Sequence, residues 1–363
     1  MSSDATPVPT GPPKGLETNR PLDRLTSLEL GGKARFLAEV EDLDSAIAAL
    51  RWAALQSQPV QILAGGSNLV VADGGFDGLV LKINLSGVSV RREGERALVT
   101  AAAGENWDGL VERAVGEGLA GIECLSGIPG TVGATPIQNV GAYGQEVAPV
   151  IERVEALDLA ALRTRSLSAE DCGFGYRDSH FRRHPGRWLV VRVTFGLMPG
   201  GEPTLAYREL RDLMRVEASS PNLEEVRSAV LELRRSKSMV LDPDDPNHRS
   251  VGSFFVNPVL DSEALARLVS STSTGIPRFE VDGAFKVPAG WLIEQAGFHR
   301  GLRRGSVGIS SNHTLALVNH GEGTTKELLD LAREIRDGVE ERFGIVLQPE
   351  PVFVGFGDAN PLA

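Results

Sequence analysis

GIPGTVGATPIQNVGAYG, residues 127–144, is the most informative stretch of this chain. It contains five glycines, a Gln-Asn pair and one tyrosine, and it has no charged side chain. Because glycine lacks a side chain, such a loop lets backbone N–H groups close around an anion. A second uncharged glycine loop, AGGSNL at residues 64–69, also follows a predicted strand. Either loop alone is more typical of a structural turn, whereas the two together favour a bound diphosphate.

The spacing of the glycines excludes the common nucleotide-binding fingerprints. Gly127, Gly130 and Gly133 follow a GxxGxxG pattern, which differs from the GxGxxG of Rossmann folds. The chain also lacks the GxxxxGKS or GxxxxGKT sequence of P-loop proteins. The two loops therefore indicate a different nucleotide-binding architecture.

Composition and charge restrict the class of partner. The 363 residues carry a formal net charge of −11, and the 37 basic residues are scattered along the chain. This distribution argues against nucleic acid or an anionic membrane as the main partner. Cys124 and Cys172 have the spacing of neither a disulfide framework nor a zinc site, so we expect two buried thiols and no metal.

The first 17 residues are rich in proline and lack the basic and apolar regions of a signal peptide. In addition, no apolar run reaches the ~20 residues that a membrane span requires. We therefore expect a cytoplasmic protein, monomeric, with a disordered tail over residues 1–17.

Hydrophobic periodicity predicts a mixed chain of helices and strands. Asn106 is a predicted helix cap, and Asn222 with Glu225 forms a capping-box signature. The second helix then ends near Arg234, Arg235 and Lys237, where cations offset the helix dipole. Helices are predicted over 41–57, 106–119, 222–237, 289–297 and 324–344, and strands within 59–83 and over 97–104, 150–160, 187–197 and 314–319.

Five motifs occur in an order that resembles one enzyme family. They are AGGSNL, SGIPGTVGATPIQNVGAYG, YRDSHFR, GSFFVNP and LQPEP, and they extend over residues 64–350. The series is similar to that of the UDP-N-acetylenolpyruvoylglucosamine reductases, in their type I branch. These are flavin enzymes of peptidoglycan precursor synthesis, and thereby of cell shape and division.

The resemblance implies an α+β fold. It consists of an FAD-binding fold of the vanillyl-alcohol-oxidase/PCMH type, built from two α/β subdomains, and a C-terminal α/β substrate-binding domain. The subdomains are expected over 18–83 and 84–220, with residues 349–363 returning to the second of them. The substrate domain is expected over 238–348.

The resemblance also implies non-covalent FAD, NADPH as co-substrate and a cradle of neutral backbone donors. Such donors suffice because hydrogen bonds to phosphate are charge-assisted. The residues implied to bind FAD are Gly65, Gly66, Ser67, Asn68, Leu69, Gly127, Ile128, Pro129, Gly130, Thr131, Gly133, Ala134, Gln138, Asn139, Gly141, Ala142 and Tyr143.

The reaction implied by the resemblance reduces an enolpyruvyl vinyl ether on a UDP-sugar, with hydride from N5 of reduced FAD. Arg177 is then the cation that holds the substrate carboxylate, although on residue pattern alone it is as well explained by pairing with Asp178. Ser253 matches the proton donor, although the bare pattern is typical of a strand start. Glu350 matches the catalytic glutamate, mounted stiffly between two prolines.

For the UDP end of the substrate, the resemblance implies four contacts. A tyrosine can cover the uracil or bond a phosphate, and a lysine supplies a compact charge. A core tyrosine and a helix-terminal lysine remain the alternatives. The four residues are Tyr207, Lys237, Asn257 and His313.

Two other functions remain open at this stage. One is a different flavin enzyme on the same cradle, such as an aldonolactone or 2-hydroxy acid oxidase. That alternative accounts for the glycine loops but not for Ser253, Glu350 and Lys237 together. The other is a non-enzymatic protein that binds a UDP-sugar or nucleotide and regulates wall synthesis.

Overall fold

The computed structural model describes residues 11–214, 221–272, 275–281, 283–357 and 361–362. The chain divides into two compact units. Unit 1 comprises residues 1–20, 34–65 and 76–235, and unit 2 comprises 21–33, 66–75 and 236–363. Most of the predicted disordered tail, residues 1–10, lies outside the described residues.

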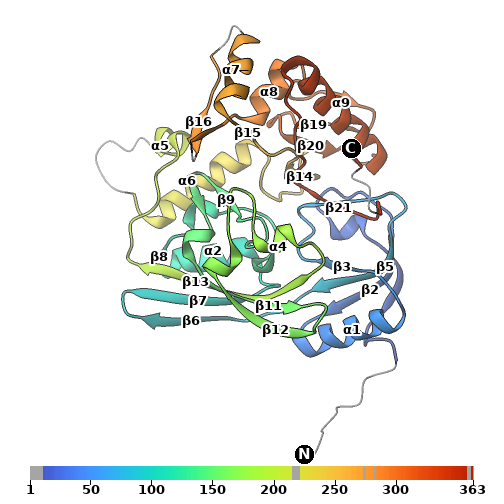
Figure 1. The fold of residues 1–363 in the computed structure, drawn as a ribbon. Coiled ribbons are helices and arrows are strands. Elements are labelled where there is room, and N and C mark those ends of the chain that lie inside the picture. The colour runs from blue at the N-terminus through green and yellow to red at the C-terminus, as the bar shows by residue number, and fades with distance from the viewer. Residues whose placement is uncertain (1–10, 215–220, 273–274, 282, 358–360, 363) are drawn as a thin grey trace, which may run out of the picture. The chain divides into compact units, whose positions relative to one another are not determined.

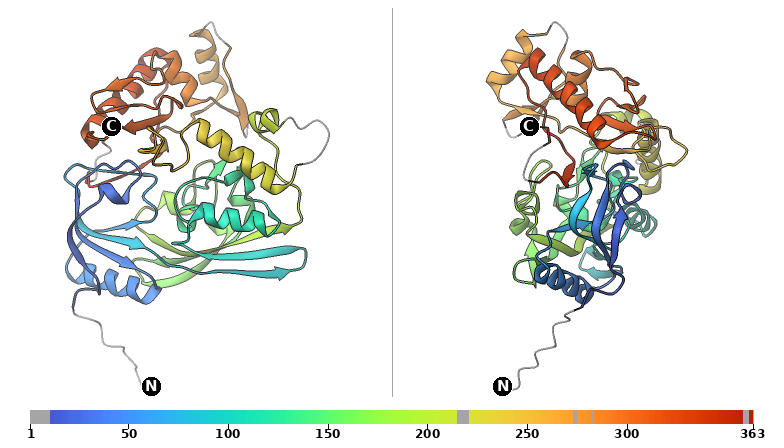
Figure 2. Two further views of the ribbon diagram at one scale, coloured as in Figure 1. Left: turned by 180° about the vertical axis from the view of Figure 1, so that it is seen from behind. Right: turned by 90° about the vertical axis from the view of Figure 1, so that its right-hand side faces the viewer.

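The first sheet of unit 1 is mainly parallel and has the strand order β1-β2-β5-β3. Its central strand β5 is almost continuously buried, as expected for a parallel strand covered on both faces. Helix α1 packs against this sheet, as both views in Figure 2 show. These elements are β1 (Glu17–Pro21), β2 (Lys33–Val40), α1 (Leu43–Leu55), β3 (Val60–Leu63) and β5 (Phe76–Ile83).

Helix α1 lies within the predicted range 41–57 for identifiable reasons. The side chain of Asp42 caps it by accepting the N–H of Ser45 at 2.7 Å. Its buried residues Ala46, Ala49, Leu50 and Ala53 follow helical spacing, so one face meets the sheet.

The second sheet of unit 1 is antiparallel, with the order β12-β11-β13-β7-β6 and β8 paired to β13 (Figure 1). Its strands are β6 (Val88–Glu93), β7 (Arg96–Ala102), β8 (Leu119–Ala120), β11 (Ile151–Asp158), β12 (Arg163–Ser168) and β13 (Trp188–Pro199). The hairpin β9 (Gly141–Ala142) and β10 (Gln145–Glu146) stands apart from this sheet.

The remaining helices of unit 1 are mostly short, and they position the loops discussed below. Asn106 caps α2 as predicted, through the N–H of Gly109 at 2.8 Å, and Asn222 and Glu225 form the predicted capping box of α6. The remaining helices of unit 1 are α2 (Trp107–Gly116), α3 (Ala169–Cys172), α4 (His180–Arg183), α5 (Arg208–Met214), α6 (Leu223–Ser236) and the 3₁₀ helices η2 (Glu123–Leu125), η3 (Val132–Ala134) and η4 (Ala148–Val150).

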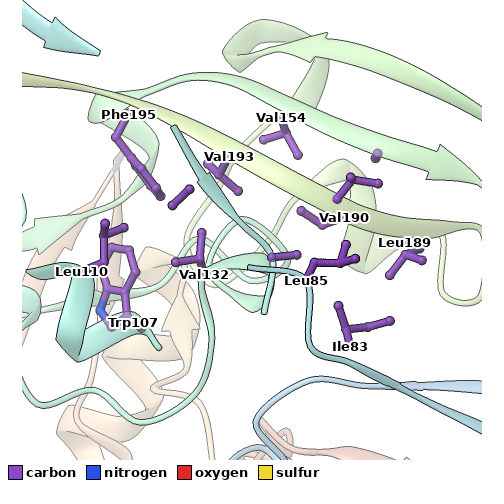
Figure 3. Close-up of a cluster of buried hydrophobic side chains, with 14 of the residues drawn as sticks. Ile83, Leu85, Trp107, Leu110, Val132, Val154, Leu189, Val190, Val193 and Phe195 are labelled. Carbon is purple, nitrogen blue, oxygen red and sulfur yellow. The ribbon is translucent and has the colours of Figure 1, made fainter. Parts of the chain in front are cut away.

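The core of unit 1 joins α2, the glycine loop and the antiparallel sheet. Trp107 is fully buried, and its ring lies 5.7 Å from that of Phe195. Val132, from the glycine loop, is buried in the same cluster (Figure 3). Part of the glycine loop is therefore fixed by the core itself.

Unit 2 contains two small antiparallel sheets and the longest described helix, α9. A capping box between Thr324 and Glu327 starts α9, and Gly344, in the left-handed region with φ +66°, ends it. One sheet has the order β14-β20-β19-β18 and the other β15-β17-β16, and α9 packs on β19 and β20 (Figure 1). The elements are η1 (Asp23–Leu25), β4 (Leu69–Val71), β14 (Ser250–Ser253), β15 (Val259–Leu260), α7 (Ser262–Ser270), β16 (Phe279–Val281), β17 (Ala284–Lys286), α8 (Ala289–Gln295), β18 (Arg303–Arg304), β19 (Val307–Ile309), β20 (Ala316–Asn319), α9 (Thr325–Phe343) and β21 (Val352–Val354).

The C-terminal segment does not follow the sequence-based expectation. We expected residues 349–363 to return to the second FAD subdomain, but β21 pairs in parallel with β4, and both strands belong to unit 2. Residues 66–75, expected within the first subdomain, also belong to unit 2. The reason is backbone pairing: β4 hydrogen-bonds to β21 and takes its flanking loops with it.

Both cysteines are buried free thiols, as predicted, and burial raises the pKa of each to about 12. Over the described ranges, no group of three or more His, Cys, Asp or Glu side chains is arranged to hold a metal ion. None of the helices in the described part of the chain combines the length and the apolarity needed to cross a membrane.

Candidate functional site

The two glycine motifs meet within unit 1. A Cβ added to Gly65 would lie 2.7 Å from Cα of Gly130, a separation that real Cβ atoms do not adopt. A Cβ on Gly133 would lie 2.5 Å from Cβ of Ala103. The chain therefore uses glycine here so that two backbone segments can touch, which is the geometry of a backbone cradle.

The rest of the first motif, residues 66–69, is held in unit 2. Gly66 has φ +65°, and a Cβ there would lie 1.9 Å from the carbonyl oxygen of Leu25. Ser27 donates its backbone N–H to the carbonyl of Gly66 at 3.1 Å. Both glycines of this motif are thus required by close backbone contacts.

Thr131 carries a buried hydroxyl that points to a missing partner. Within the described part of the chain, its Oγ1 has no hydrogen-bond partner. A buried hydroxyl without a partner is costly, so such atoms in native proteins usually bond water or a ligand. Together with the cradle at Gly65 and Gly130, this atom fits a phosphate-bearing cofactor such as FAD.

Asp108, on the first turn of α2, fixes the entrance of the glycine loop. Its Oδ1 accepts the N–H of Gly127 at 2.6 Å and Nη1 of Arg227 at 2.6 Å, and its Oδ2 accepts Nη2 of Arg227 at 3.0 Å. Burial alone would raise the pKa of Asp108, but hydrogen bonds from Arg227 and Gly127 and the charge of Arg234 hold it below its ordinary value. Arg227 and Arg234 offset the negative charge of Asp108, so this carboxylate is compatible with an anion bound nearby.

Arg234 lies beneath the same loop. Its side chain is buried, and burial lowers its pKa, while Tyr143 and Asp108 act in the opposite direction. A Cβ on Gly127, whose φ is +71°, would approach Cδ of Arg234 to 3.3 Å. Arg234 is in the last turn of α6 as predicted, but its burial against the loop goes beyond dipole compensation.

Three residues of the candidate site hold a left-handed backbone without being glycine. They are Asn139, Tyr143 and Arg177, with φ of +44°, +49° and +52°. Such conformations cost about 1–3 kcal/mol each and cluster where function requires them. Asn139 is fixed by its amide, which donates to Oε2 of Glu146 at 2.7 Å and to the carbonyl of Gly175 at 3.0 Å.

Arg177 points to the hairpin β9–β10. Its Nη2 donates to the carbonyl of Gly141 at 2.6 Å, and its Nη1 lies 3.5 Å from the carbonyl of Asn139. Asp178 pairs with Arg183. The guanidinium of Arg177 therefore lies among residues expected to line the flavin.

Tyr207 lies against the same hairpin. Tyr207 is 38% exposed, and its ring meets the ring of Tyr143 edge-on, with centroids 5.3 Å apart. Burial raises the pKa of Tyr143 to about 12 and also raises the pKa of Tyr207. Both phenols therefore stay protonated near neutral pH and can donate hydrogen bonds.

In unit 2, Ser253 and Glu350 are brought together by a hydrogen-bonded ribbon. The N–H of Glu350 donates to the carbonyl of Phe254 at 2.9 Å, and the N–H of Val256 donates to the carbonyl of Gln348 at 2.9 Å. Ser253, which ends β14, pairs on its other side with Ala316 of β20. Two segments almost one hundred positions apart are thus paired through their backbones, and Ser253 and Glu350 are both half-buried.

Lys237 and His313 are also linked within unit 2. Their neighbours Ser238 and Asn312 are hydrogen-bonded, Nδ2 of Asn312 donating to Oγ of Ser238 at 2.9 Å. Asn257 accepts the N–H of Ala289 at 2.8 Å, so its side-chain oxygen caps α8. The structure therefore links the neighbours of two of the four predicted UDP contacts and gives a third a structural role.

Two acidic residues of unit 1 were not identified from the sequence. Asp108 occupies the first turn of a helix, where acids are common, and its partner Arg227 is 119 residues away. Glu123 stands in an unremarkable stretch, although it is fully buried. Neither residue carried a sequence signal, because the partner of each lies far away in the chain.

Comparisons with known proteins agree with this geometry. Residues 34–161 match a family model described as an FAD binding domain. Residues 244–354 match one described as UDP-N-acetylenolpyruvoylglucosamine reductase, C-terminal domain.

Individual relatives cover nearly the whole chain. A UDP-N-acetylenolpyruvoylglucosamine reductase of Thermobifida fusca is 47% identical over 347 residues, 93% of this chain and 97% of that protein. One from Streptomyces coelicolor is 46% identical over 346 residues, 92% of this chain and 89% of that protein. Among solved structures, UDP-N-acetylenolpyruvylglucosamine reductase from Thermus caldophilus matches with a TM-score of 0.62 at 26% identity, covering 92% of this chain and 97% of that one.

Proposed function

Because this chain belongs to the UDP-N-acetylenolpyruvoylglucosamine reductase family, we propose that NADPH is its electron donor and an enolpyruvyl UDP-sugar its substrate. The chain is an FAD-dependent oxidoreductase of peptidoglycan precursor synthesis, on a fold of the vanillyl-alcohol-oxidase/PCMH type. The proposed substrate is UDP-N-acetyl-3-O-(1-carboxyvinyl)-glucosamine and the product UDP-N-acetylmuramate. We further propose that it works in the cytoplasm as a monomer.

The residues of unit 1 are suited to hold FAD without a covalent link. The backbone at Gly65 and Gly130 closes a cradle without side chains, and the hydroxyl of Thr131 is ready to bond an oxygen of the cofactor. When bound, FAD supplies hydride transfer from NADPH to the vinyl carbon of the substrate. The hairpin β9–β10 and its fixed neighbour Asn139 would shape the flavin edge.

Arg177 is the proposed cation. Adding hydride to the vinyl ether places negative charge on the neighbouring carbon and its carboxylate, and a fixed planar fork offsets that charge best. The bond to Gly141 at 2.6 Å anchors one nitrogen of the guanidinium in a strained backbone. That arrangement supports preorganisation rather than a mobile surface charge.

Ser253 is the proposed proton donor and Glu350 the proposed assisting acid. A serine hydroxyl is a weak acid, so it can serve only against a strongly basic carbanion in a site that excludes water. Glu350 lies on the segment whose backbone pairs with Phe254, the residue after Ser253, and we assign it to assist Ser253. The hydride and the proton from Ser253 together saturate the double bond, and Ser253 regains its proton from solvent before the next turnover.

The UDP end of the substrate is assigned to Tyr207, Lys237, Asn257 and His313. Lys237 and His313 lie beside a bonded Ser238–Asn312 pair, so two groups suited to a diphosphate have a common mount. This local arrangement would let a protein of net charge −11 bind an anion.

The single observation that carries the proposal is the pairing of the Ser253 strand with the Glu350 segment. An oxidase built on the same cradle has no need of a proton donor and an acid on two paired segments. The proposal therefore predicts that the two halves of the reaction can be separated by mutation at Ser253.

The test is an anaerobic titration of the purified holoenzyme in two steps. With Ser253→Ala, NADPH should reduce the flavin at the wild-type rate, while reoxidation by the UDP-sugar should slow by about 10²–10⁴-fold. Ser250→Ala, on the same strand, is the matched control, because its hydroxyl bonds only the neighbouring backbone at Gly252 among the contacts seen here. Equal slowing of both steps would make Ser253 structural. Wild-type flavin that stays reduced with this substrate but reoxidises rapidly in air would identify an oxidase.

A further inference from the structure

Glu123 is a buried acidic residue with no place in the proposed chemistry. Its side chain is fully buried, and three N–H groups point at its carboxyl oxygens. Oε2 accepts the N–H of Gly121 at 2.7 Å, and Oε1 accepts Nε2 of Gln145 at 3.0 Å and the N–H of Thr204 at 2.7 Å. Burying a carboxyl group is costly unless such bonds are made, so this arrangement has to be explained.

Thr204 is held at each of its three polar groups. Its N–H donates to Glu123, its hydroxyl accepts Nε2 of Gln145 at 3.1 Å, and its carbonyl accepts the thiol of Cys124 at 3.1 Å. The thiol can act as this donor because burial, and then the charge of Glu123, raise the pKa of Cys124 to about 12. One point of the chain is thus fixed by three neighbours.

The segment 204–207 lies along the turn end of the hairpin β9–β10. Gln145, directly after the turn, bonds Thr204, and Tyr143, in the turn, contacts the ring of Tyr207. Between these points, a Cβ on Gly144 would lie 2.9 Å from Cβ of Ala206. The side chain of Gln145 also accepts the N–H of Cys124 at 2.9 Å, which ties the hairpin to η2.

We propose that Glu123 is a positioning residue for Tyr207. It fixes Thr204, and through Thr204 it sets Tyr207 against the hairpin that lines the flavin. The proposal rests on the proposed function in one respect, the assignment of Tyr207 to the UDP end of the substrate. Its consequence is that affinity for a UDP-sugar depends on a buried carboxyl group that does not touch the sugar.

The first measurement requires no substrate. In Glu123→Gln, the amide group cannot accept all three N–H bonds, so at least one of them is lost. Hydrogen exchange at residues 204–207 should accelerate by about tenfold or more, since local opening costs less when a charge-assisted bond is gone. Asp158→Asn is the matched control: Asp158 is also a fully buried carboxyl group of unit 1, bonded to Ala160, Ala161 and Arg187 instead.

The second measurement uses the holoenzyme under turnover. Glu123→Gln should raise KM for the UDP-sugar by about tenfold, the ratio expected from one weakened bond of this kind. Reduction of the flavin by NADPH and kcat should stay within about twofold. Thr204→Val, which keeps the backbone but loses the hydroxyl, should show a smaller change of the same kind and covers the case of a Glu123 variant that does not fold.

A double-mutant cycle decides whether Glu123 acts through Tyr207. In a Tyr207→Ala background, Glu123→Gln should raise KM no further, because the residue that it positions is already gone. Additive effects, or exchange at 204–207 that is unchanged in Glu123→Gln, would overturn the proposal. Wild-type protein without turnover of the UDP-sugar would instead overturn the proposed function, and the exchange measurement would still report whether Glu123 holds Thr204.

Discussion

The fork of Arg177 combines a strained backbone with a hydrogen bond to a hairpin, and both features restrict what can replace it. Lysine offers a single point charge and cannot bond Gly141 and bind a carboxylate bidentately at the same time. We expect Arg177→Lys to lower kcat for the UDP-sugar by at least about 10²-fold, as for loss of a preorganised donor. Stopped-flow reduction of the flavin by NADPH, which should remain near wild type, separates this loss from a general defect.

Gly65 offers a test of the cradle at a single atom. Gly65→Ala places a methyl group 2.7 Å from Cα of Gly130, and backbone on both sides cannot yield without shifting the loop. We expect FAD affinity to fall by at least about tenfold, in line with the 1–3 kcal/mol of typical overpacking. Gly116→Ala is the control in the same unit, because a Cβ there meets nothing within 4 Å. Equal FAD affinity of the two variants, measured by flavin fluorescence, would refute a tight cradle at Gly65.

For single residues, the sequence singled out the glycines of the candidate site but not its buried acidic residues. Gly65 and Gly130 lie in uncharged, glycine-rich motifs, and this composition indicates a loop that closes around an anion. Asp108 and Glu123 gain their roles only from Arg227 and Thr204, which are 119 and 81 residues away in the chain. No local pattern can reveal a partner at such a distance.

Among the secondary-structure elements, α2 and α6 form the support of the glycine loop. The first turn of α2 holds Gly127 through Asp108, and its backbone N–H at Trp107 donates to the carbonyl of Gly130 at 3.1 Å. Helix α6 contributes Arg227 and the buried Arg234. Helix α2 therefore fixes the first four residues of the loop, and α6 offsets the charge of Asp108.

The ion pair between Asp108 and Arg227 should affect how the free energy of unfolding changes at acid pH. The pKa of Asp108 is lower in the folded protein than in the unfolded chain, so the unfolded chain binds the proton first as the pH falls. The contribution of Asp108 is complete above the ordinary carboxyl pKa of about 4 and disappears as the pH falls through the lower, folded value. Asp108→Asn should therefore flatten the loss of stability below about pH 4, as measured by urea unfolding at several pH values.

The partner of Asp108 gives a second prediction at the same scale. Arg227→Gln leaves a partly buried carboxyl group beside the cradle without its fork, and we expect FAD affinity to fall by about tenfold. The control is Glu117→Gln at the end of α2, the helix that carries Asp108. It breaks an exposed ion pair with Arg113 and should leave FAD affinity unchanged. If both variants bind FAD like the wild type, the clamp does not shape the loop.

Elements with their own caps and periodicity were predictable. The predicted ranges contain the helices α1, α2, α6, α8 and α9 and the strand β11, and they overlap the strands β7 and β13, which extend one and two residues beyond them. Short elements such as β15, β16 and β17 were not predicted. Strands of two or three residues carry no periodicity, and their existence depends on a neighbour that the sequence does not identify.

For the molecule as a whole, each unit has its own hydrophobic core. FAD should therefore protect the two units to different extents. We expect FAD to slow hydrogen exchange most at residues 127–146 of unit 1, and less at α9 of unit 2, by the linkage between ligand and folded state. Uniform protection across both segments, measured by mass spectrometry with and without FAD, would contradict a cradle centred on the glycine loop.

The unit boundaries illustrate what sequence reasoning could not reach. The expected subdomains were continuous ranges, 18–83 and 84–220, whereas unit 2 takes residues 21–33 and 66–75 from within unit 1. Contacts such as the bond from Asn319 to the carbonyl of Leu28, at 3.0 Å, hold these excursions in place. The motifs indicated the family, but only three-dimensional pairing shows which residues fold together.

The pairing of β4 with β21 has a consequence for how this chain folds during its synthesis on the ribosome. Residues 69–71 emerge early, and their partner at 352–354 is synthesised almost last. At 5–20 residues per second, β4 waits on the order of tens of seconds with an unpaired edge. Such long-range closure is slow and leaves the nascent chain open to aggregation. Chaperone engagement during synthesis, and not the chemistry of the mature enzyme, would then limit its yield in a cell.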